Sequence, residues 1–318
     1  MTDTNVDLMV KIAKLYYRQR LTQAEVAQRV GLSRQTVSRV LQRAEDLGIV
    51  TVEIRETHSA DNALAGEVQA RFPTVSVTIV PTNPASLAGT TRTVARAAAR
   101  FCERRLTPGT TLGLAWGNTA LEFARSLSSG PHPDITVVQI DGSIPRGAGT
   151  GGAEYVVHEA ADALGATARP LMSPLYVDTR AIRDALMSDS RTAETIALAR
   201  SADLAAFSIG TADDSSGLRS SGFLSSEELA ELAAAGAVGE VCGQFFAVDG
   251  EPRGLDLAAR SISLSMDEIC AIPIRALLVA GREKDRATVG ALNAGLATDL
   301  FVDAELARGI IEVADSLM

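Results

Sequence analysis

The sequence predicts an α/β protein with two parts: a small winged helix-turn-helix domain at the N-terminus and, behind it, a larger doubly wound, mostly parallel α/β domain. Residues 21–49 carry the spacing of a helix-turn-helix, and residues from 75 onward alternate short apolar runs with helical segments. A length of 318 residues suits about two domains. We expect the first domain at residues 1–55, a linker helix at 56–72 and the second domain at 73–318.

The helix-turn-helix pattern is marked at its turn and at both helix starts. Ala27 is the small residue where two helices cross, and Gly31 is a turn residue free to adopt a positive φ. Thr22 and Glu25 have the spacing of a capping box, and Ser33 stands where an N-cap accepts hydrogen bonds from free amides. Apolar spacing predicts a small three-helix core that contains Val26, Val30, Leu32, Val37 and Val40.

The second helix of this motif turns polar and basic side chains away from the predicted core. Arginine pairs bidentately with a guanine edge and glutamine with adenine, while hydroxyls at a helix start suit phosphates. The pattern therefore predicts a reader of double-stranded operator DNA, with the residues Ser33, Arg34, Gln35, Thr36, Ser38, Arg39, Gln42 and Arg43. The alternative is a helical hairpin that only packs or dimerises, which leaves the glycine turn and the outward basic side chains unexplained.

Positive charge is concentrated around this motif. Residues 10–48 carry a net charge of plus five, whereas the whole chain carries minus nine, so the other residues carry minus fourteen. An acidic remainder repels DNA, so the basic head must be held away from it and gains affinity by pairing two heads on one palindromic site. We therefore expect a homo-oligomer, either a dimer or a tetramer.

The remaining composition excludes several classes of protein. The first residues are polar, unlike an export signal, and no apolar run reaches the roughly 20 residues that span a bilayer. This predicts a cytoplasmic protein with no membrane partner. Cys102, Cys242 and Cys270 are too widely spaced for a disulfide framework or a zinc cluster, and the three histidines are scattered. We expect buried free thiols and neither a metal nor a cofactor.

Two short segments connect the motif to the larger domain. Residues 49–54 alternate apolar and polar side chains, which predicts a strand that serves as a wing beside the DNA backbone. Residues 56–72 follow, with Leu64, Val68 and Phe72 at four-residue intervals. This spacing predicts an ordered linker helix that could also pack against its symmetry mate.

The larger domain has a β-α-β rhythm. Apolar runs at 75–80, 110–116 and 135–140 alternate with helical segments at 86–105, from 119 and at 153–164. The rhythm resumes with runs that begin at residues 204, 238, 274 and 298. The expected result is a parallel sheet covered by helices.

Ligands of such sheets bind at the carboxyl ends of strands, so polar residues there are candidate ligand contacts. Residues 113–120 run from a strand through a turn into a helix, where the backbone amides of Gly117, Asn118 and Thr119 and the Thr119 hydroxyl would form a phosphate cradle. A tight turn is the structural alternative. Trp116, the sole tryptophan, would either wall this pocket or fill the core.

Two further strand ends carry charged residues. Asp141 could accept hydrogen bonds from sugar hydroxyls, with Arg146 as a charge partner, although a plain β-turn also explains the Asp141-Gly142 pair. Lys284 is the one lysine outside the basic head, and it would neutralise a phosphate unless it is a solvated surface residue.

In this order, the motifs resemble those of the SorC family of sugar-responsive bacterial transcription regulators. The resemblance spans nearly the whole chain and includes, besides the helix-turn-helix, GLAWGNT at 113–119, QIDGS at 139–143, FSIG at 207–210, SGFLSSEEL at 221–229, GAVGEVCGQFF at 236–246 and AGREK at 280–284. It implies a C-terminal domain similar to ribose-phosphate and glucosamine-phosphate isomerases. It also implies dimers or tetramers and allosteric control of operator binding by a phosphorylated sugar. The effector-binding residues that follow are Trp116, Gly117, Asn118, Thr119, Asp141, Gly281 and Lys284.

Two positions depart from the family pattern. Ala247 follows the double phenylalanine where the family often has aspartate, and Arg282 follows Gly281 where a second glycine is usual. Loss of an acceptor and gain of a guanidinium favour a more anionic ligand, or one with fewer hydroxyls at that edge.

Two other functions remain open. A sugar-phosphate isomerase would need a poised general base in a strand-end loop, and the nearest approach is Asp213-Asp214, within a polar serine-rich loop. We therefore predict no catalytic residues and no enzyme. A third possibility is a DNA-binding scaffold whose C-terminal domain only oligomerises.

Overall fold

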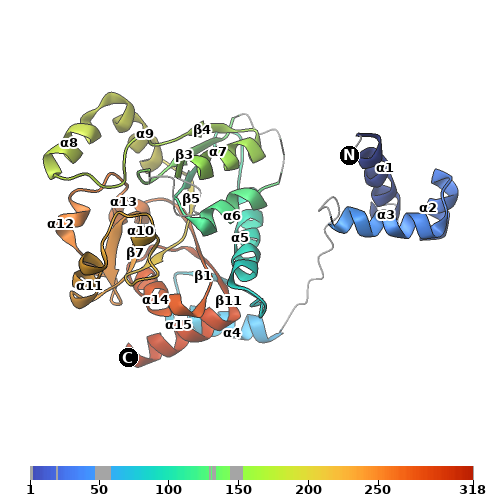
Figure 1. Ribbon diagram of the computed structural model, residues 1–318. Coiled ribbons are helices and arrows are strands. Elements are labelled where there is room, and N and C mark those ends of the chain that lie inside the picture. The colour runs from blue at the N-terminus through green and yellow to red at the C-terminus, as the bar shows by residue number, and fades with distance from the viewer. Residues whose placement is uncertain are drawn as a thin grey trace. The chain divides into compact units, whose positions relative to one another are not determined.

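The computed structural model describes residues 3–18, 21–46, 59–128, 130, 134–143 and 153–317. The chain divides into two compact units, Met1–Thr57 and His58–Met318 (Figure 1). The predicted wing at residues 49–54 and Arg146 lie outside the described residues. Within the described part of the chain, no helix is long and apolar enough to cross a membrane.

The N-terminal unit is a bundle of short helices around one core. Its elements are α1 (Asp3–Ala13), the π-helical turn η1 (Lys14–Arg18), α2 (Gln23–Val30) and α3 (Arg34–Asp46). Thr22 and Glu25 form the predicted capping box, and Gly31 ends α2 with φ 72°. Val26 and Val37 are fully buried, whereas Val30, Leu32 and Val40 pack around them partly exposed.

A seven-stranded parallel sheet forms the centre of the larger unit. Its order is β1-β11-β10-β5-β2-β3-β4, so the chain reverses its direction of strand addition between β5 and β2. Because helices cover both faces, the central strands are buried almost throughout. The strands are β1 (Ser76–Val80), β2 (Thr111–Leu114), β3 (Thr136–Gln139), β4 (Thr167–Arg169), β5 (Leu204–Phe207), β10 (Ile274–Val279) and β11 (Asp299–Asp303).

Two hydrophobic clusters separate the sheet from its helices. One face packs on α5 (Leu87–Glu103), α6 (Asn118–Ser126) and α7 (Ala153–Leu164). The other face packs on α4 (Ser59–Arg71), α9 (Ser190–Arg200), α13 (Met266–Cys270), α14 (Asp285–Asn293) and α15 (Ala304–Leu317). The remaining described helices of this unit are α8 (Arg180–Ser188), α10 (Gly217–Ser220), α11 (Ser226–Ala234), α12 (Leu255–Ala258) and the 3₁₀ turn η2 (Arg282–Lys284).

Residues 238–246 were predicted to be one strand of the parallel sheet, and this prediction is wrong. They form an antiparallel hairpin. Cys242 and Gly243 both adopt positive φ, 49° and 75°, which turns the chain back on itself between β7 and β8. The hairpin belongs to a second, antiparallel sheet of order β6-β7-β8-β9. Its strands are β6 (Gly210–Thr211), β7 (Ala237–Val241), β8 (Gln244–Ala247) and β9 (Pro252–Arg253).

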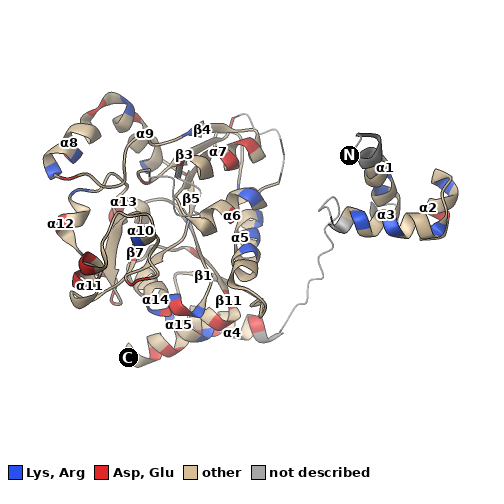
Figure 2. Ribbon diagram, in the orientation of Figure 1, with Lys and Arg blue, Asp and Glu red and all other residues tan. Residues whose placement is uncertain are grey.

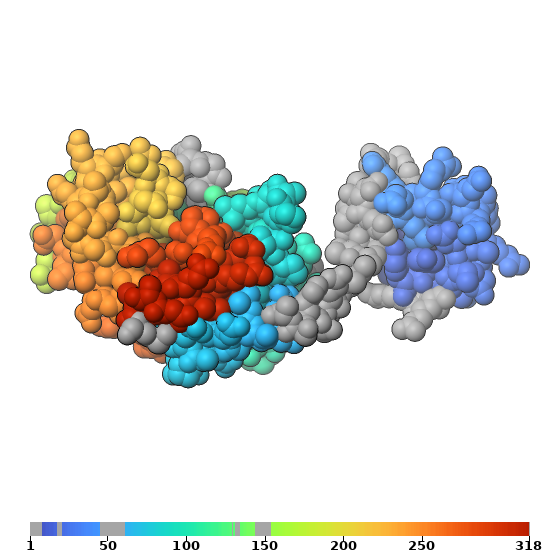
Figure 3. Space-filling view, turned by 90° about the horizontal axis from the view of Figure 1, so that it is seen from below, coloured from blue at the N-terminus to red at the C-terminus, as the bar shows by residue number. Residues whose placement is uncertain are grey.

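The helix predicted as a linker, α4, is packed into the larger unit. Val68 is fully buried, and Leu64 and Phe72 pack partly exposed on the same cluster. Arg71 forms a bidentate ion pair with Asp315 of α15, with nitrogen–oxygen distances of 2.6 and 2.8 Å. Figure 3 shows α4 and α15 side by side on one face of this unit.

Candidate functional site

The predicted DNA-reading helix is α3, and its side chains sort cleanly between core and solvent. Thr36 is half-buried, and its backbone N–H donates to Ser33 Oγ at 3.1 Å, so Ser33 caps the helix start. Figure 2 shows the basic residues along α3. The predicted contact residues that are exposed on this helix are Arg34, Gln35, Ser38, Arg39, Gln42 and Arg43.

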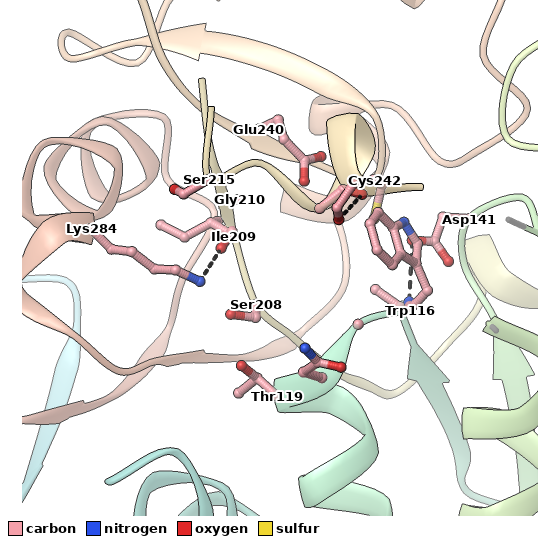
Figure 4. Close-up of a pocket in the computed structure, with 15 residues that line it drawn as sticks. Trp116, Thr119, Asp141, Ser208, Ile209, Gly210, Ser215, Glu240, Cys242 and Lys284 are labelled. Carbon is pink, nitrogen blue, oxygen red and sulfur yellow. Dashed lines mark hydrogen bonds between the residues drawn. The ribbon is translucent and has the colours of Figure 1, made fainter. Parts of the chain in front are cut away.

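A second site is a cavity of about 240 Å³ in the larger unit. It opens where β2, β3 and β5 end, beside the point at which the strand order reverses, which is where ligands bind in open α/β sheets. Figure 4 shows polar side chains from these strand ends, from β7 and from η2 facing one space. The volume suits a small metabolite rather than a drug-sized molecule.

The start of α6 forms one wall of this cavity. Gly117 precedes the helix with φ 124° and ψ 166°, a conformation essentially restricted to glycine. No side chain caps α6, so the amides of its first turn, Asn118 and Thr119 among them, keep their hydrogen-bonding capacity toward the cavity. An uncapped helix start with its positive dipole end favours an anionic group.

Lys284 supplies a cation to the same space. Its Nζ donates a hydrogen bond of 2.9 Å to the carbonyl oxygen of Ile209, which fixes the ammonium beside the end of β5 (Figure 4). Burial lowers the pKa of Lys284, and the nearby carboxyl groups of Glu283, Glu240 and Asp213 partly oppose that change. The ammonium is therefore a local and partly desolvated charge.

Two buried carboxyl groups, those of Asp141 and Glu240, also line the cavity. Burial raises the pKa of Glu240 to about 7, although the backbone N–H of Gly243 and the charge of Lys284 oppose the rise. Burial likewise raises the pKa of Asp141 well above its usual value, against a hydrogen bond from the Trp116 N–H and with the charge of Glu240 adding to the rise. Both groups are thus poised to exchange hydrogen bonds with a ligand.

Two polar atoms at the cavity lack partners among the described residues. Asp141 Oδ2 accepts from the backbone N–H of Trp116 at 3.3 Å, but its Oδ1 has no partner, and neither has Ser208 Oγ. A buried polar atom without a hydrogen bond is costly, so such atoms call for a partner that arrives with a ligand or water.

Trp116 closes the cavity against α10. A Cβ at position 217 would lie 3.0 Å from Cη2 of the Trp116 ring, so a larger residue there would require the ring to shift by a few tenths of an ångström. The tryptophan is therefore a wall of the cavity, which was one of its two predicted placements.

The structure brings together six of the seven predicted effector-binding residues and separates one. Gly281 does not line the cavity, because its N–H donates to Asp303 Oδ2 at 2.9 Å within the turn that leads to Lys284. Ser208, Glu240 and Cys242 also line the cavity and were not predicted from the sequence. The glycine that follows Cys242 could have indicated the hairpin that brings Glu240 and Cys242 to the cavity.

Asp213, the nearest approach to a catalytic base, is engaged elsewhere. Burial opposes its ionisation, but hydrogen bonds from Ser215 and Thr211 outweigh that effect and lower its pKa. A carboxylate held in this way is a weak proton acceptor.

Comparisons with known proteins give the family. A model of a sugar-binding domain matches residues 56–312, and a model of the MarR family matches residues 15–59. The chain belongs to the SorC family of sugar-binding transcriptional regulators. It is 26% identical over 305 residues to the deoxyribonucleoside regulator of Bacillus subtilis (strain 168), covering 96% of this chain and 97% of that protein.

The sorbitol operon regulator of Klebsiella pneumoniae is similar in sequence and in fold. Its sequence is 25% identical over 310 residues, covering 97% of this chain and 98% of that protein. The crystal structure of the full-length regulator matches with a TM-score of 0.82 at 24% identity, covering 98% of this chain and 99% of that chain. These SorC-family relatives are regulators and not enzymes, so the chain is a DNA-binding transcriptional regulator with a sugar-binding domain.

Proposed function

We propose that a phosphorylated sugar bound in the cavity controls how tightly this regulator holds its operator. The observation that carries the proposal is the pairing of an uncapped helix start and Lys284 with the buried carboxyl groups of Asp141 and Glu240 in one cavity. A sugar phosphate has matching chemistry, because it joins an anionic group to several hydroxyl donors.

The phosphate is assigned to the start of α6. There, backbone amides of Asn118 and Thr119 and the Thr119 hydroxyl can donate hydrogen bonds, and the helix dipole adds favourable electrostatics. Lys284 supplies a full positive charge from the other side of the cavity. An anion recovers part of the desolvation cost that lowers the pKa of Lys284.

The sugar hydroxyls are assigned to the acceptor-rich part of the cavity. Asp141 Oδ1 and Ser208 Oγ are buried without partners, and Glu240 is next to them in the lining. Hydroxyl donors would satisfy these atoms, so a ligand that lacks them forfeits the hydrogen bonds and leaves the same atoms unpaired.

Control of DNA binding requires at least two heads on one operator. We propose a homo-oligomer, a dimer or a tetramer, whose paired α3 helices enter successive major grooves about one helical turn, roughly 34 Å, apart. A ligand that favours one arrangement of subunits changes operator affinity by the same coupling energy, typically about 1 to 3 kcal/mol. Light scattering of the purified chain measures the subunit number, and a monomer at concentrations that bind the operator would refute this part.

Trp116 provides a direct test, because it is the sole tryptophan and lines the cavity. The full-length chain is titrated with sugar phosphates and with the matching free sugars while its emission is recorded. Operator affinity is then measured by anisotropy on a duplex selected from a random pool. We expect at least one phosphate ester, and not its free sugar, to change the emission and to shift operator affinity by about 5- to 150-fold.

A matched pair of variants assigns the response to the cavity. Lys284→Gln should raise the ligand concentration needed for a half-maximal emission change by at least about tenfold. This is the effect expected for loss of a charge-assisted contact worth about 1.5 kcal/mol or more. Arg286→Gln removes the same charge from an exposed position two residues later, in the first turn of α14, and should leave the response unchanged. If no phosphate ester changes the emission of the wild-type protein, the assignment is wrong.

A further inference from the structure

A row of four arginines runs along the outer face of α5. Arg92, Arg96 and Arg100 of α5 and Arg104 at its C-cap, here called the α5 arginine row, recur at every fourth residue, about 6 Å apart along a helix. Figure 2 shows this concentration of basic residues on α5. The function proposed above does not use these residues.

The row is exposed along a helix whose other face is buried. Val94, Ala98 and Cys102 are fully buried in the core between α5 and the sheet, whereas Arg92, Arg96 and Arg104 are exposed. In the described part of the chain, no carboxylate lies within ion-pair distance of these three side chains. Like charges four residues apart destabilise a helix by about 0.2 to 0.5 kcal/mol per pair, so the neighbouring pair Arg92 and Arg96 is a net cost to folding.

Other helices of this unit place a carboxylate beside an arginine. Arg125 pairs with Glu122 on α6, Arg308 with Glu305 on α15, and Arg180 with Asp184 on α8. The row also contrasts with the net charge of minus fourteen that the chain carries outside residues 10–48. A merely solvated helix face would be expected to follow the mixed pattern of the other helices.

We propose that the α5 arginine row binds the phosphate backbone of duplex DNA that flanks the operator. The exposed guanidinium groups of Arg92, Arg96 and Arg104 suit a line of phosphates, because each can form a bidentate hydrogen-bonded pair with phosphate oxygens. The chain is a DNA-binding regulator, so flanking duplex is present at high effective concentration once the head is bound. Repeated arginines on a helix bind phosphates through charge and spacing, so this contact is independent of base sequence.

The salt dependence of DNA binding tests the proposal. Full-length wild-type protein is titrated against a short duplex that holds only the operator and a long duplex with added flanks. Each phosphate contact adds about 0.9 to the slope of log affinity against log salt. For the wild type, we expect a steeper slope on the long duplex than on the short one. The variant Arg92→Gln/Arg96→Gln/Arg104→Gln should reduce the magnitude of the slope on the long duplex by up to about 2.7. On the short duplex the variant should match the wild type.

Two controls separate this contact from general charge and from misfolding. Arg169→Gln/Arg191→Gln/Arg286→Gln removes the same charge from exposed sites outside α5 and should leave both slopes unchanged. Arg92→Lys/Arg96→Lys/Arg104→Lys keeps the charge and should retain most of the slope on the long duplex. Equal wild-type slopes on the two duplexes overturn the proposal even if the glutamine variant fails to fold. A glutamine variant that changes the subunit number but not the slope also overturns it, because the row then binds a second copy.

Discussion

The DNA-reading helix α3 and the cavity of the larger unit position their polar side chains in different ways. In α3, the predicted contact residues lie within a single turn-and-helix segment at residues 33–43, on the face opposite the core. The cavity gathers its lining from segments as far apart as Ala115 and Lys284, which meet only because their strands are neighbours in one sheet. The head should therefore depend on local helix geometry, and the cavity on backbone conformation at several strand ends.

The largest expected effect separates the two units. Val37→Asp places an unpaired carboxylate in the core of the head, at a cost of about 3 to 5 kcal/mol, which is comparable with the whole stability of so small a unit. We expect operator binding to fall by more than about 100-fold, while the Trp116 emission response to ligand persists.

A matched variant places the same charge on the surface of the head. Gln28→Asp lies on an exposed position of α2 and should keep the helix content of the head, measured by circular dichroism. Loss of the ligand response in Val37→Asp would show that the units do not fold independently.

The next largest effect concerns reading of base sequence by α3. Arg34→Ala should reduce discrimination between the operator and a single-base variant by about 1 to 3 kcal/mol, roughly 5- to 150-fold, because a bidentate base contact is lost. Arg43→Ala, farther along the helix, should weaken binding to both duplexes alike if it contacts phosphate. Competition anisotropy with the two duplexes measures both. Equal losses on both duplexes for Arg34→Ala would contradict its assignment as a base reader.

A backbone variant tests the dependence of the cavity on local conformation. Gly117→Ala introduces about 1 to 3 kcal/mol of strain at a glycine-only φ, and so displaces the amides at the start of α6. We expect about tenfold weaker phosphate-ester binding and unchanged operator binding in the absence of ligand. An added Cβ would meet no atom within 4 Å at position 117, so strain and not a clash causes the loss.

The control for that variant is Gly66→Ala in α4. An added Cβ there also meets no atom within 4 Å, but the residue is helical, so the substitution should be neutral or stabilising. If Gly117→Ala binds the ligand as the wild type does, the helix start does not hold the phosphate.

The smallest expected effect is a pH dependence of ligand binding. Burial raises the pKa of Glu240 to about 7, so this carboxyl is mostly neutral below that pH and becomes a carboxylate above it. The new negative charge repels a phosphate ester, so affinity should fall by a few-fold as the pH rises from about 6.5 to 8. Glu240→Gln should flatten this fall, and calorimetric titration across that range measures it. A wild-type affinity that rises over the same range would contradict the sign.

The raised pKa of Glu240 also affects the stability of the fold. A carboxyl whose folded pKa lies above its unfolded value adds stability at low pH, which is lost as the pH rises toward the folded pKa. For Glu240 this window runs from its ordinary value of 4.5 to about 7. The residue thus weakens the fold near neutral pH, which is typical of groups that are kept for binding.

Much of the architecture followed from patterns that are local in the chain. The capping box at Thr22, the left-handed Gly31 and the apolar spacing of α2 and α3 identified the head, because helix starts and turns are decided by neighbouring residues. The parallel sheet followed from apolar runs long enough to be buried on both faces. The hairpin at Cys242 was missed because two short strands with one apolar pattern read as a single longer strand.

What the sequence by itself determined was therefore the head, the parallel sheet and the chemistry at several strand ends, including Thr119, Asp141 and Lys284. Only the tertiary structure decided that Glu240 and Ser208 join them, and that Gly281 does not. The physical reason is the sheet order: β5 lies between β10 and β2, and the antiparallel hairpin folds over their ends, so residues as far apart as Ala115 and Lys284 share one cavity. No spacing along the chain encodes such neighbours.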